Sequence, residues 1–302
     1  MAISRSQLVK ELEPGLNALF GLEYARYDNQ AAQIFETESS DRAFEEEVML
    51  SGFANARVKP EGSSIVYDSA NETFTARYTH ETIALAFAVT EEAVEDNLYD
   101  RISARYTKAL ARSMANTKQV KGANVLNNGF NNAFPGGDGV ALLSTAHPTI
   151  GGGPLRNELA VPADLNETSL EQSLIDIAAF IDERGLLIAA TGRKLIIPPA
   201  LQFVADRLME STLRVGTADN DINAIKNMGM IPEGYAVNNY LTDIDAFFIK
   251  TDVPNGFKHF VRSPIRTSME GDFDTGNVRY KARERYSFGF SDPRCVFGSP
   301  GA

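Results

Sequence analysis

The most regular hydrophobic pattern in the chain runs from Thr73 to Phe130 and changes its period half-way along. In the first half, apolar side chains occupy alternate positions, which places them on one face of a β-strand. These residues are Ile83, Leu85, Phe87 and Val89. In the second half, apolar residues recur about every four positions, as on one face of an amphipathic helix. These residues are Val94, Leu98, Ile102, Tyr106, Leu110 and Met114.

We therefore predict an unbroken strand over 73–89 that leads directly into a helix from Glu91 to Met114, or on to Leu126. Thr90 has a hydroxyl typical of an N-cap, and Glu91 and Glu92 would face the positive end of the helix dipole. A strand over this whole stretch would be about 55 Å long. That length is unusual for a compact enzyme domain and indicates an arm attached to a long helix.

Residues 47 to 88 are predicted to form a two-stranded antiparallel hairpin. Strand signals over 53–67 are weak and are broken by Pro60-Glu61-Gly62, and turn residues occupy 68–71. The outer half of this hairpin has few large aliphatic residues, and an isolated hairpin is only marginally stable in water. We therefore expect the hairpin to lie on another chain, which is the first indication of assembly.

The rest of the chain predicts a mixed α+β module, because helical and strand patterns alternate. A helical pattern at 5–24 is interrupted by Pro14-Gly15, which predicts two short helices or one bent helix. A capping box at Thr168–Glu171 is expected to open a helix that Gly185 ends. The inward residues of that helix are predicted to be Leu170, Leu174, Ile177 and Ile181. The other predicted elements are a glycine-rich loop at 127–154, a strand at 194–197, a helix at about 200–211, and short strands at 235–237, 247–249 and 257–261.

Two segments of opposite charge stand out. The tail over 277–290 alternates apolar residues with a basic stripe of Arg279, Lys281, Arg283 and Arg285. Basic residues between aromatic ones can indicate nucleic-acid binding, but a strand with a charged solvent face is the preferred interpretation. The acidic segment over 36–47 contains Glu45, Glu46 and Glu47 and is either a solvated flank or a partner for a basic surface of a neighbouring subunit.

Composition narrows the function classes. The 302 residues carry a net charge of −11, which argues against a protein that grips nucleic acid over its whole surface. No run of apolar residues is long enough for a transmembrane helix, and the N-terminus lacks the apolar region of a secretory signal. The single cysteine, Cys295, excludes an internal disulfide and suits a reducing cytosol.

Candidate chemistry is nearly absent from the sequence. His80, His147 and His259 lie far apart and have no metal-ligand companions, so each is expected to be structural. Ser144, His147 and Asp138 could form a hydrolase triad only if the fold brought them together. Residues 219–223 begin like a calcium loop, but Ala224 replaces the required glycine and Met230 the bidentate glutamate. We predict no catalytic residue, no cofactor and no metal.

Three sequence strings carry a resemblance to a known family. They are DGVALLSTAHP at 138–148, ESTLRVGTADNDIN at 210–223 and RERYSFGFSDPR at 283–294. With the order of the predicted elements, they make the chain similar to the major capsid proteins of tailed bacteriophages, which have the Hong Kong 97-type α+β fold. The likeness covers nearly the whole chain, and it looks strongest to the major head subunits of Mu-like phages.

The resemblance implies a division of the chain. Residues 1–45 would be an N-arm and 46–88 an E-loop that reaches over a neighbour. Residues 89–163 would form the peripheral domain with a spine helix and the glycine-rich loop. Residues 164–264 would form the axial domain, and 265–302 would return to the peripheral domain.

The resemblance also implies partners and a place. Copies of the chain would form pentamers and hexamers in an icosahedral shell that encloses double-stranded DNA without binding it specifically. A net negative protein suits this role, because like charge keeps DNA from adhering to the wall. Since the chain starts at Met1 with no cleaved extension, scaffolding is expected from a separate protein. A portal is expected too, and a decoration protein is left open. The mature location would be the virion, with assembly in the host cytoplasm.

The expected assembly contacts are Glu45, Glu46, Glu47 and Lys59 on the hairpin side and Arg279, Lys281, Arg283 and Arg285 on the tail strand. The two charged groups are expected to attract each other within or between subunits. One family member joins a lysine to an asparagine covalently, but Lys59 near the hairpin tip does not by itself indicate such a crosslink. Two alternatives stay open: an encapsulin-type shell with a protein cargo, and a soluble α/β hydrolase that uses Ser144 and His147.

Overall fold

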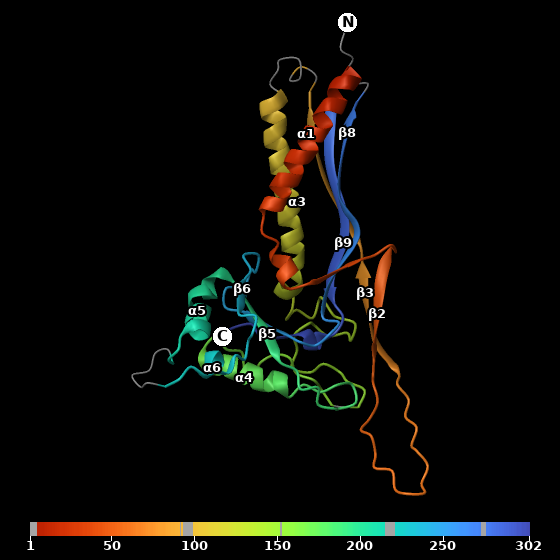
Figure 1. The fold of residues 1–302 in the computed structure, drawn as a ribbon, viewed down its shortest axis with the longest axis vertical. Helices are drawn as coiled ribbons and strands as arrows, with labels where there is room; N and C mark the ends of the chain where they lie inside the picture. Colours follow the sequence, from red (N-terminus) through yellow and green to blue (C-terminus); the bar gives the residue numbers. More distant parts are fainter. Residues whose placement is uncertain (1–4, 91, 93–98, 152, 215–220, 273–275) are drawn as a thin grey trace.

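The computed structural model describes residues 5–90, 92, 99–151, 153–214, 221–272 and 276–302, and it has a mixed α+β architecture (Figure 1). The helices are α1 (Arg5–Arg26), α3 (Tyr99–Asn127), α4 (Glu167–Ala178), α5 (Gln202–Glu210) and α6 (Ala224–Met228). Short 3₁₀ turns are η1 (Gln30–Gln33), η2 (Pro199–Leu201) and η3 (Pro293–Cys295). The strands are β1 (Glu36–Ser39), β2 (Phe44–Leu50), β3 (Glu72–Thr79), β4 (Glu81–Val89), β5 (Gly192–Ile197), β6 (Tyr235–Val237), β7 (Phe247–Thr251), β8 (Phe257–Gly271), β9 (Val278–Phe290) and β10 (Val296–Ser299).

The first sheet is long and has the order β1-β8-β9-β4, with α1 and α3 packed on one face (Figure 1). Leu16 and Phe20 of α1 are buried with Leu110 and Met114 of α3 against Tyr280 of β9. The burial of Leu16 and Phe20 helps explain why α1 is one continuous helix with Pro14 inside it, because tertiary packing offsets the hydrogen bond that proline removes. The alternative of two short helices is therefore wrong.

The second sheet has the order β10-β7-β5-β6 and, with α4, α5 and α6, encloses the largest cluster of buried residues. The strands predicted at 194–197, 235–237 and 247–249 and the helix at about 200–211 are confirmed. The start of α4 differs from the prediction. Asn166 caps it and exchanges two hydrogen bonds with Ser169. The side-chain oxygen of Asn166 accepts from the Ser169 N–H at 2.9 Å, and the Asn166 N–H donates to the Ser169 hydroxyl at 3.0 Å.

The end of α4 also differs from the prediction. The helix stops at Ala178, so Ile181 and Gly185 lie beyond it, in a tight turn that Asp182 closes. Asp182 Oδ1 accepts hydrogen bonds from the backbone N–H groups of Arg184 and Leu186, and this local side-chain capping competes with helix continuation.

The predicted unbroken strand over 73–89 is wrong, because the chain changes sheets at His80. β3 pairs with β2 in a separate two-stranded sheet, whereas β4 pairs with β9 in the first sheet. His80 is buried, and its two ring nitrogens lie 3.0 Å from the hydroxyls of Ser40 and Ser287. The hairpin therefore comprises β2 and β3 with the loop 51–71 between them, which has no helix or strand, and it does not extend to residue 88.

Helix α3 confirms the predicted long helix, and its end at Asn127 agrees with the longer alternative. Leu110 and Met114 are buried as predicted, but Tyr106 is 52% exposed. Positions four residues apart advance about 40° around a helix of 3.6 residues per turn, so a strict four-residue repeat leaves the buried face. Ser103 and Thr107 occupy that face instead. The predicted start at Glu91, with Val94 and Leu98, lies outside the described residues.

Strand β9 confirms the alternation predicted for the tail. Val278, Tyr280 and Ala282 are buried, while Arg279 and Lys281 are exposed. The inward series continues with Glu284, whose carboxylate is 2% exposed and lies 3.4 Å from Lys118 Nζ on α3. Within the described part of the chain, no helix has the length and apolar character needed to cross a membrane.

Candidate functional site at the hairpin arm and its root

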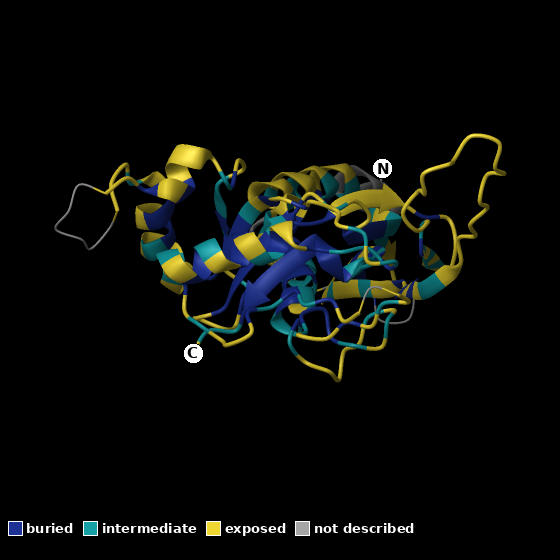
Figure 2. Ribbon diagram, turned by 90° about the horizontal axis from the view of Figure 1, so that it is seen from below, coloured by how far each residue is buried: buried dark blue, intermediate teal, exposed yellow. Residues whose placement is uncertain are grey.

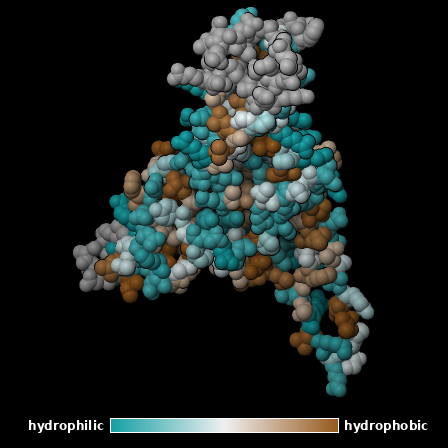
Figure 3. Space-filling view, turned by 45° about the horizontal axis from the view of Figure 1, so that its top comes forward, coloured by the Kyte–Doolittle hydropathy of each residue, from teal (hydrophilic) through white to brown (hydrophobic). Residues whose placement is uncertain are grey.

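The hairpin projects from the rest of the molecule (Figure 1). We call residues 44–79 the arm, and the loop 51–71 at its end the arm loop. Most of the arm loop is exposed (Figure 2), and apolar side chains lie on its surface (Figure 3). Val58 and Tyr67 are 94% exposed, and Ile65 and Val66 are about two-thirds exposed. A projecting group of exposed apolar side chains marks an interaction surface.

The inner end of the arm is tied to β9 by a short chain of hydroxyls and a carboxylate. The Tyr78 hydroxyl hydrogen-bonds with Ser291, and the Ser291 hydroxyl donates to Glu47. Burial raises the pKa of Tyr78 well above its usual range. The Tyr78 ring also packs edge-on against Phe260, with 4.9 Å between the ring centroids. These contacts fix both strands of the arm at one end.

Two glycines make room for this attachment. A Cβ at Gly289 would lie 2.7 Å from the Tyr78 ring, and a Cβ at Gly137 would lie 2.8 Å from the Thr75 carbonyl oxygen. Both distances are shorter than real Cβ contacts, so any larger residue would push the arm outward. Gly137 belongs to the glycine-rich loop, which therefore has a structural reason for that composition at this point.

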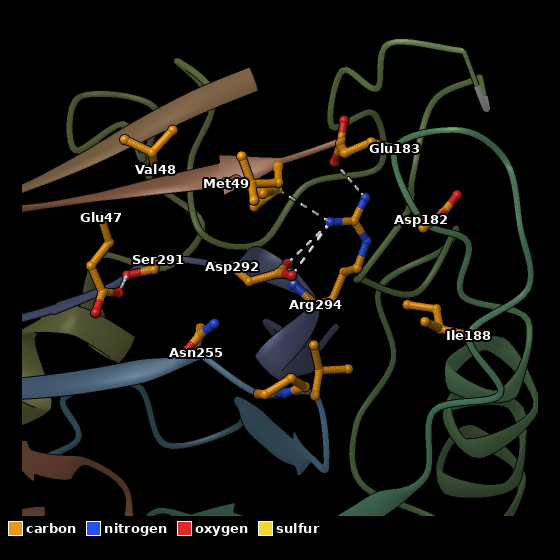
Figure 4. Close-up of a pocket in the computed structure, with 13 residues that line it drawn as sticks. Glu47, Val48, Met49, Asp182, Glu183, Ile188, Asn255, Ser291, Asp292 and Arg294 are labelled. Carbon is orange, nitrogen blue, oxygen red and sulfur yellow. Dashed lines mark hydrogen bonds and ion pairs between the residues drawn. The ribbon is translucent and has the colours of Figure 1, made fainter. Parts of the chain in front are cut away.

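We call the cluster of Arg294, Glu183, Asp292 and Met49 the arm root, and Arg294 lies at its centre (Figure 4). Its side chain is 4% exposed, and Nη2 donates to Glu183 Oε1 at 2.6 Å. Nη1 donates to Asp292 Oδ1 at 3.2 Å and contacts the Met49 sulfur of β2 at 3.6 Å. Nε donates to the Ile181 carbonyl at 2.8 Å. The guanidinium therefore joins β2, the turn after α4 and the segment before β10.

Burial raises the pKa of Asp292, and the adjacent Arg294 opposes that rise. Arg294 and its two carboxylate neighbours form a buried charge network in which the cation must stay in place, because either acid would be left desolvated without it.

A second buried network lies beside the first. His147 is 1% exposed, with Nδ1 2.5 Å from Asp138 Oδ2 and Nε2 3.0 Å from Asn157 Oδ1. Asn157 also donates to the Leu142 and Pro293 carbonyls, at 2.7 and 2.9 Å. This network connects the glycine-rich loop to the segment that carries Arg294.

These contacts contradict the hydrolase alternative. The structure does bring Asp138 and His147 together, but the second ring nitrogen faces Asn157 instead of Ser144. The Ser144 hydroxyl accepts a hydrogen bond from the Ala146 N–H at 3.2 Å. A triad needs the serine hydroxyl on the free nitrogen of the histidine, and that nitrogen is occupied.

The predicted acidic contacts all have partners within their own chain. Glu45 accepts from Ser40 at 2.6 Å, and Glu46 lies 3.7 Å from the Arg77 guanidinium. Glu47 accepts from Ser291, as described above. Lys59 is exposed in the arm loop.

The basic stripe lies on the exposed face of β9. Arg279 pairs with Asp272, while Arg283 is directly opposite Arg266 on β8. Lys281, Arg283 and Arg285 have no ion pair within the described residues, nor does any ion pair there link the stripe to Glu45, Glu46 or Glu47. One member of the stripe and one of the acids affect His80. Burial and Arg285 lower the pKa of His80, whereas Glu45 raises it.

Sequence reasoning missed Arg294, Glu183 and Asn157. The signal that could have found Arg294 was the string Ser291-Asp292-Pro293-Arg294, in which two charged residues flank a proline directly before a buried strand. The described residues hold no group of three or more His, Cys, Asp or Glu side chains suited to a metal ion. The calcium-loop-like stretch at 219–223 begins outside those residues.

Comparison with known proteins gives the family. A family model described as phage capsid protein matches residues 73–298, about three quarters of the chain. The chain belongs to this family of phage capsid proteins. It is thus a major capsid protein of the tailed-phage type, which forms the icosahedral head, and the encapsulin alternative is not favoured. No curated protein sequence matches the chain significantly.

Solved structures show that this capsid protein has the expected Hong Kong 97-type fold. The capsid of cyanophage P-SCSP1u aligns with a TM-score of 0.58 at 11% identity, over 89% of this chain and 86% of that one. Mycobacterium phage Che8 aligns with a TM-score of 0.53 at 16% identity, over 90% and 92% of the two chains. A virus-like particle from Pyrococcus furiosus aligns with a TM-score of 0.52 at 10% identity, over 94% and 97%. The closer likeness to Mu-like phages stays a prediction.

Proposed function

We propose that this capsid protein joins its subunits by laying the arm on a neighbouring copy, in pentamers and hexamers of one icosahedral shell. The observation that carries the proposal is the arm itself. It is anchored at one end by Arg294, Glu47 and Tyr78, while the apolar side chains of its loop have no cover in their own chain. A second copy would supply that cover and bury the exposed apolar area.

The arrangement suits a shell in which one sequence occupies places of slightly different geometry. Closed symmetric assemblies need interfaces that repeat, and an icosahedral shell adds small changes of angle between them. An arm fixed at its root and free along its loop can follow such changes while it keeps its contacts. Residues 1–45 would serve as N-arm, 46–88 as E-loop and 89–163 as part of the peripheral domain. Within that E-loop, residues up to 79 form the arm, and 81–88 belong to β4 of the first sheet. Residues 164–264 would meet their copies at capsomer centres, and 265–302 would complete the peripheral domain.

The same proposal covers activity, contents and partners. The chain acts as a structural protein and not as an enzyme, which is consistent with the occupied ring nitrogens of His147. It encloses double-stranded DNA without specific binding, since a net charge of −11 disfavours adhesion of DNA to the wall. A separate scaffolding protein and a portal would take part in assembly in the host cytoplasm.

The basic stripe is proposed as a second assembly contact. Glu45, Glu46 and Glu47 each have a partner in their own chain, so these acids support the root of the arm. The exposed Lys281 and Arg283 and the half-exposed Arg285 have no ion pair within the described residues, so they could face an acidic surface of a neighbouring subunit.

Deletion of Pro60–Tyr67 tests the role of the arm. The deletion removes much of the exposed apolar surface but leaves Asp68, which accepts from Ala54 at 2.8 Å and pairs with Arg184 at 3.0 Å. We expect a folded subunit by circular dichroism and thermal melting, and no shells by size-exclusion chromatography and negative-stain microscopy.

A full-length variant separates loss of surface from loss of chain length. Val58→Ser with Tyr67→Ser keeps the loop and should also reduce shell yield. Val161→Ser, at a residue that is 76% exposed outside the arm, serves as the control and should assemble normally. Normal shells from the deletion variant would refute the proposal.

A further inference from the structure

A cavity of about 530 Å³ opens at the arm root (Figure 4). Four consecutive residues of β2, Glu47 to Leu50, line it. β2 has a register shift between Val48 and Leu50, so its side chains do not alternate strictly here, but a cavity that touches four consecutive residues runs along the strand. β3 occupies one edge of β2, because β2 and β3 form a sheet of only two strands. The cavity therefore follows the unpaired edge of β2, where an extended segment could add by main-chain hydrogen bonds.

The cavity is acidic. Its lining contains the carboxylates of Glu47, Asp182, Glu183 and Asp292 and a single guanidinium, that of Arg294. The guanidinium is already engaged by Glu183, Asp292 and the Ile181 carbonyl. The Glu183 side chain is only 5% exposed, and its Oε2 has no hydrogen-bond partner in the described part of the chain. A buried carboxylate oxygen without a partner is costly, so the site is suited to a cationic side chain from elsewhere.

The chain itself contains a segment with the matching chemistry. Arg57, Val58 and Lys59 lie in the arm loop, are exposed, and have no helix or strand of their own. In an extended segment the two cations point to the same side, since they are two residues apart, and Val58 points to the other. Neither cation has an ion pair among the residues that the structure describes. The base of the arm loop lies beside this cavity, where Asp68 pairs with Arg184, but the loop then projects away from the rest of the molecule, so we assign the segment to another copy (Figure 1).

We propose that residues 57–59 of a second copy add to the free edge of β2 and place Arg57 and Lys59 against the carboxylates of the cavity. The inference rests on the proposed function, because it names the place on the neighbour where the arm loop binds. Ile188 and Val253 at the cavity wall give the aliphatic parts of these side chains an apolar contact. Assembly would then give the buried Glu183 Oε2 a hydrogen-bond donor from the neighbouring copy.

Disulfide trapping tests the contact in assembled shells. Lys59→Cys is combined with Ile188→Cys, a cavity residue that is 40% exposed. The native Cys295 is buried and does not compete. A disulfide forms only when the two Cβ atoms come within about 3.5–4.5 Å, so the result is specific for the proposed position. The matched control pairs Lys59→Cys with Val161→Cys, which is exposed but outside the cavity.

We expect the K59C/I188C shells to lose the monomer band on a non-reducing gel and to show a ladder of covalent oligomers, whereas the two single variants and the control stay monomeric. Arg57→Glu with Lys59→Glu should lower the urea concentration at which shells dissociate. Shells that form without a ladder would overturn the inference and leave the proposed function intact. A band that contains another protein linked to residue 188 would overturn it too. Failure of the proposed function is seen separately, as normal shells from the Pro60–Tyr67 deletion.

Discussion

Removal of the Arg294 guanidinium is the sharpest test of how the arm root is held. Arg294→Met keeps most of the side-chain length and leaves Glu183 and Asp292 in place without their cation. Arg294 and Glu183 are 4% and 5% exposed, so water cannot replace the lost partner without opening the site. The Ile181 carbonyl loses its donor as well.

The expected loss follows from these contacts. Breaking a buried ion pair by removal of one partner costs about 3–5 kcal/mol. Whole domains are stable by only about 5–15 kcal/mol, so the variant would lose a large share of its free energy of unfolding. Arg156→Met is the matched control. It breaks an ion pair of 2.7 Å with Asp176 in which the arginine is 37% exposed, and such pairs are worth about 0–1 kcal/mol.

The measurement is urea unfolding of the Pro60–Tyr67 deletion variant, which is expected to stay unassembled, with and without each substitution. In Arg294→Met the pKa of Asp292 should rise further, because burial raises it and the opposing cation is gone. A carboxyl whose folded pKa is raised stabilises at low pH and loses that contribution as pH rises. The deficit should therefore shrink on acidification. A loss no larger than that of Arg156→Met would refute the argument.

Two further predictions concern the first sheet. The pKa of His259 is lowered from 6.5 to about 4 by burial and by Lys118, so the contribution of this histidine to wild-type stability should fall by about 3 kcal/mol as pH falls from about 6.5 through about 4. His259→Phe should flatten that slope in urea titrations at several pH values, and an unchanged slope would contradict the assignment. Arg283→Glu with Arg285→Glu should reduce shell formation, and added salt should weaken wild-type assembly. Shell yields by light scattering that match wild type in both cases would disprove a role for the basic stripe.

Periodic patterns in the sequence were enough to predict the elements that bury one face. β9 alternates as Tyr280 and Arg279 indicate, and α3 buries Leu110 and Met114, because burial on one face selects a period directly. The break at His80 left no such signal. The residues on both sides of it have strand propensity, and which sheet a strand joins depends on partners far away in sequence.

The arm root could not be predicted for a related reason. Arg294 and Glu183 are 111 positions apart, and Asn157 lies in a loop that precedes both of them in the sequence. Each is an ordinary polar residue until the fold removes it from water. The strings at 138–148 and 283–294 supported recognition without a physical meaning. The structure gives them one, since they supply His147, Asp138, Asp292 and Arg294 to adjacent buried networks.

The change of sheet at His80 has a mechanical consequence for a shell built from this chain. A single residue separates β3 from β4, so a pull on the arm passes directly along the backbone into β4. β4 is held to β9 by nine residue pairs from Glu81–Tyr286 to Val89–Val278. A force along the strand axis loads the hydrogen bonds of these pairs together in shear, whereas a force across it would peel them one at a time. A force on the arm along the strand axis is therefore distributed over the full length of β4.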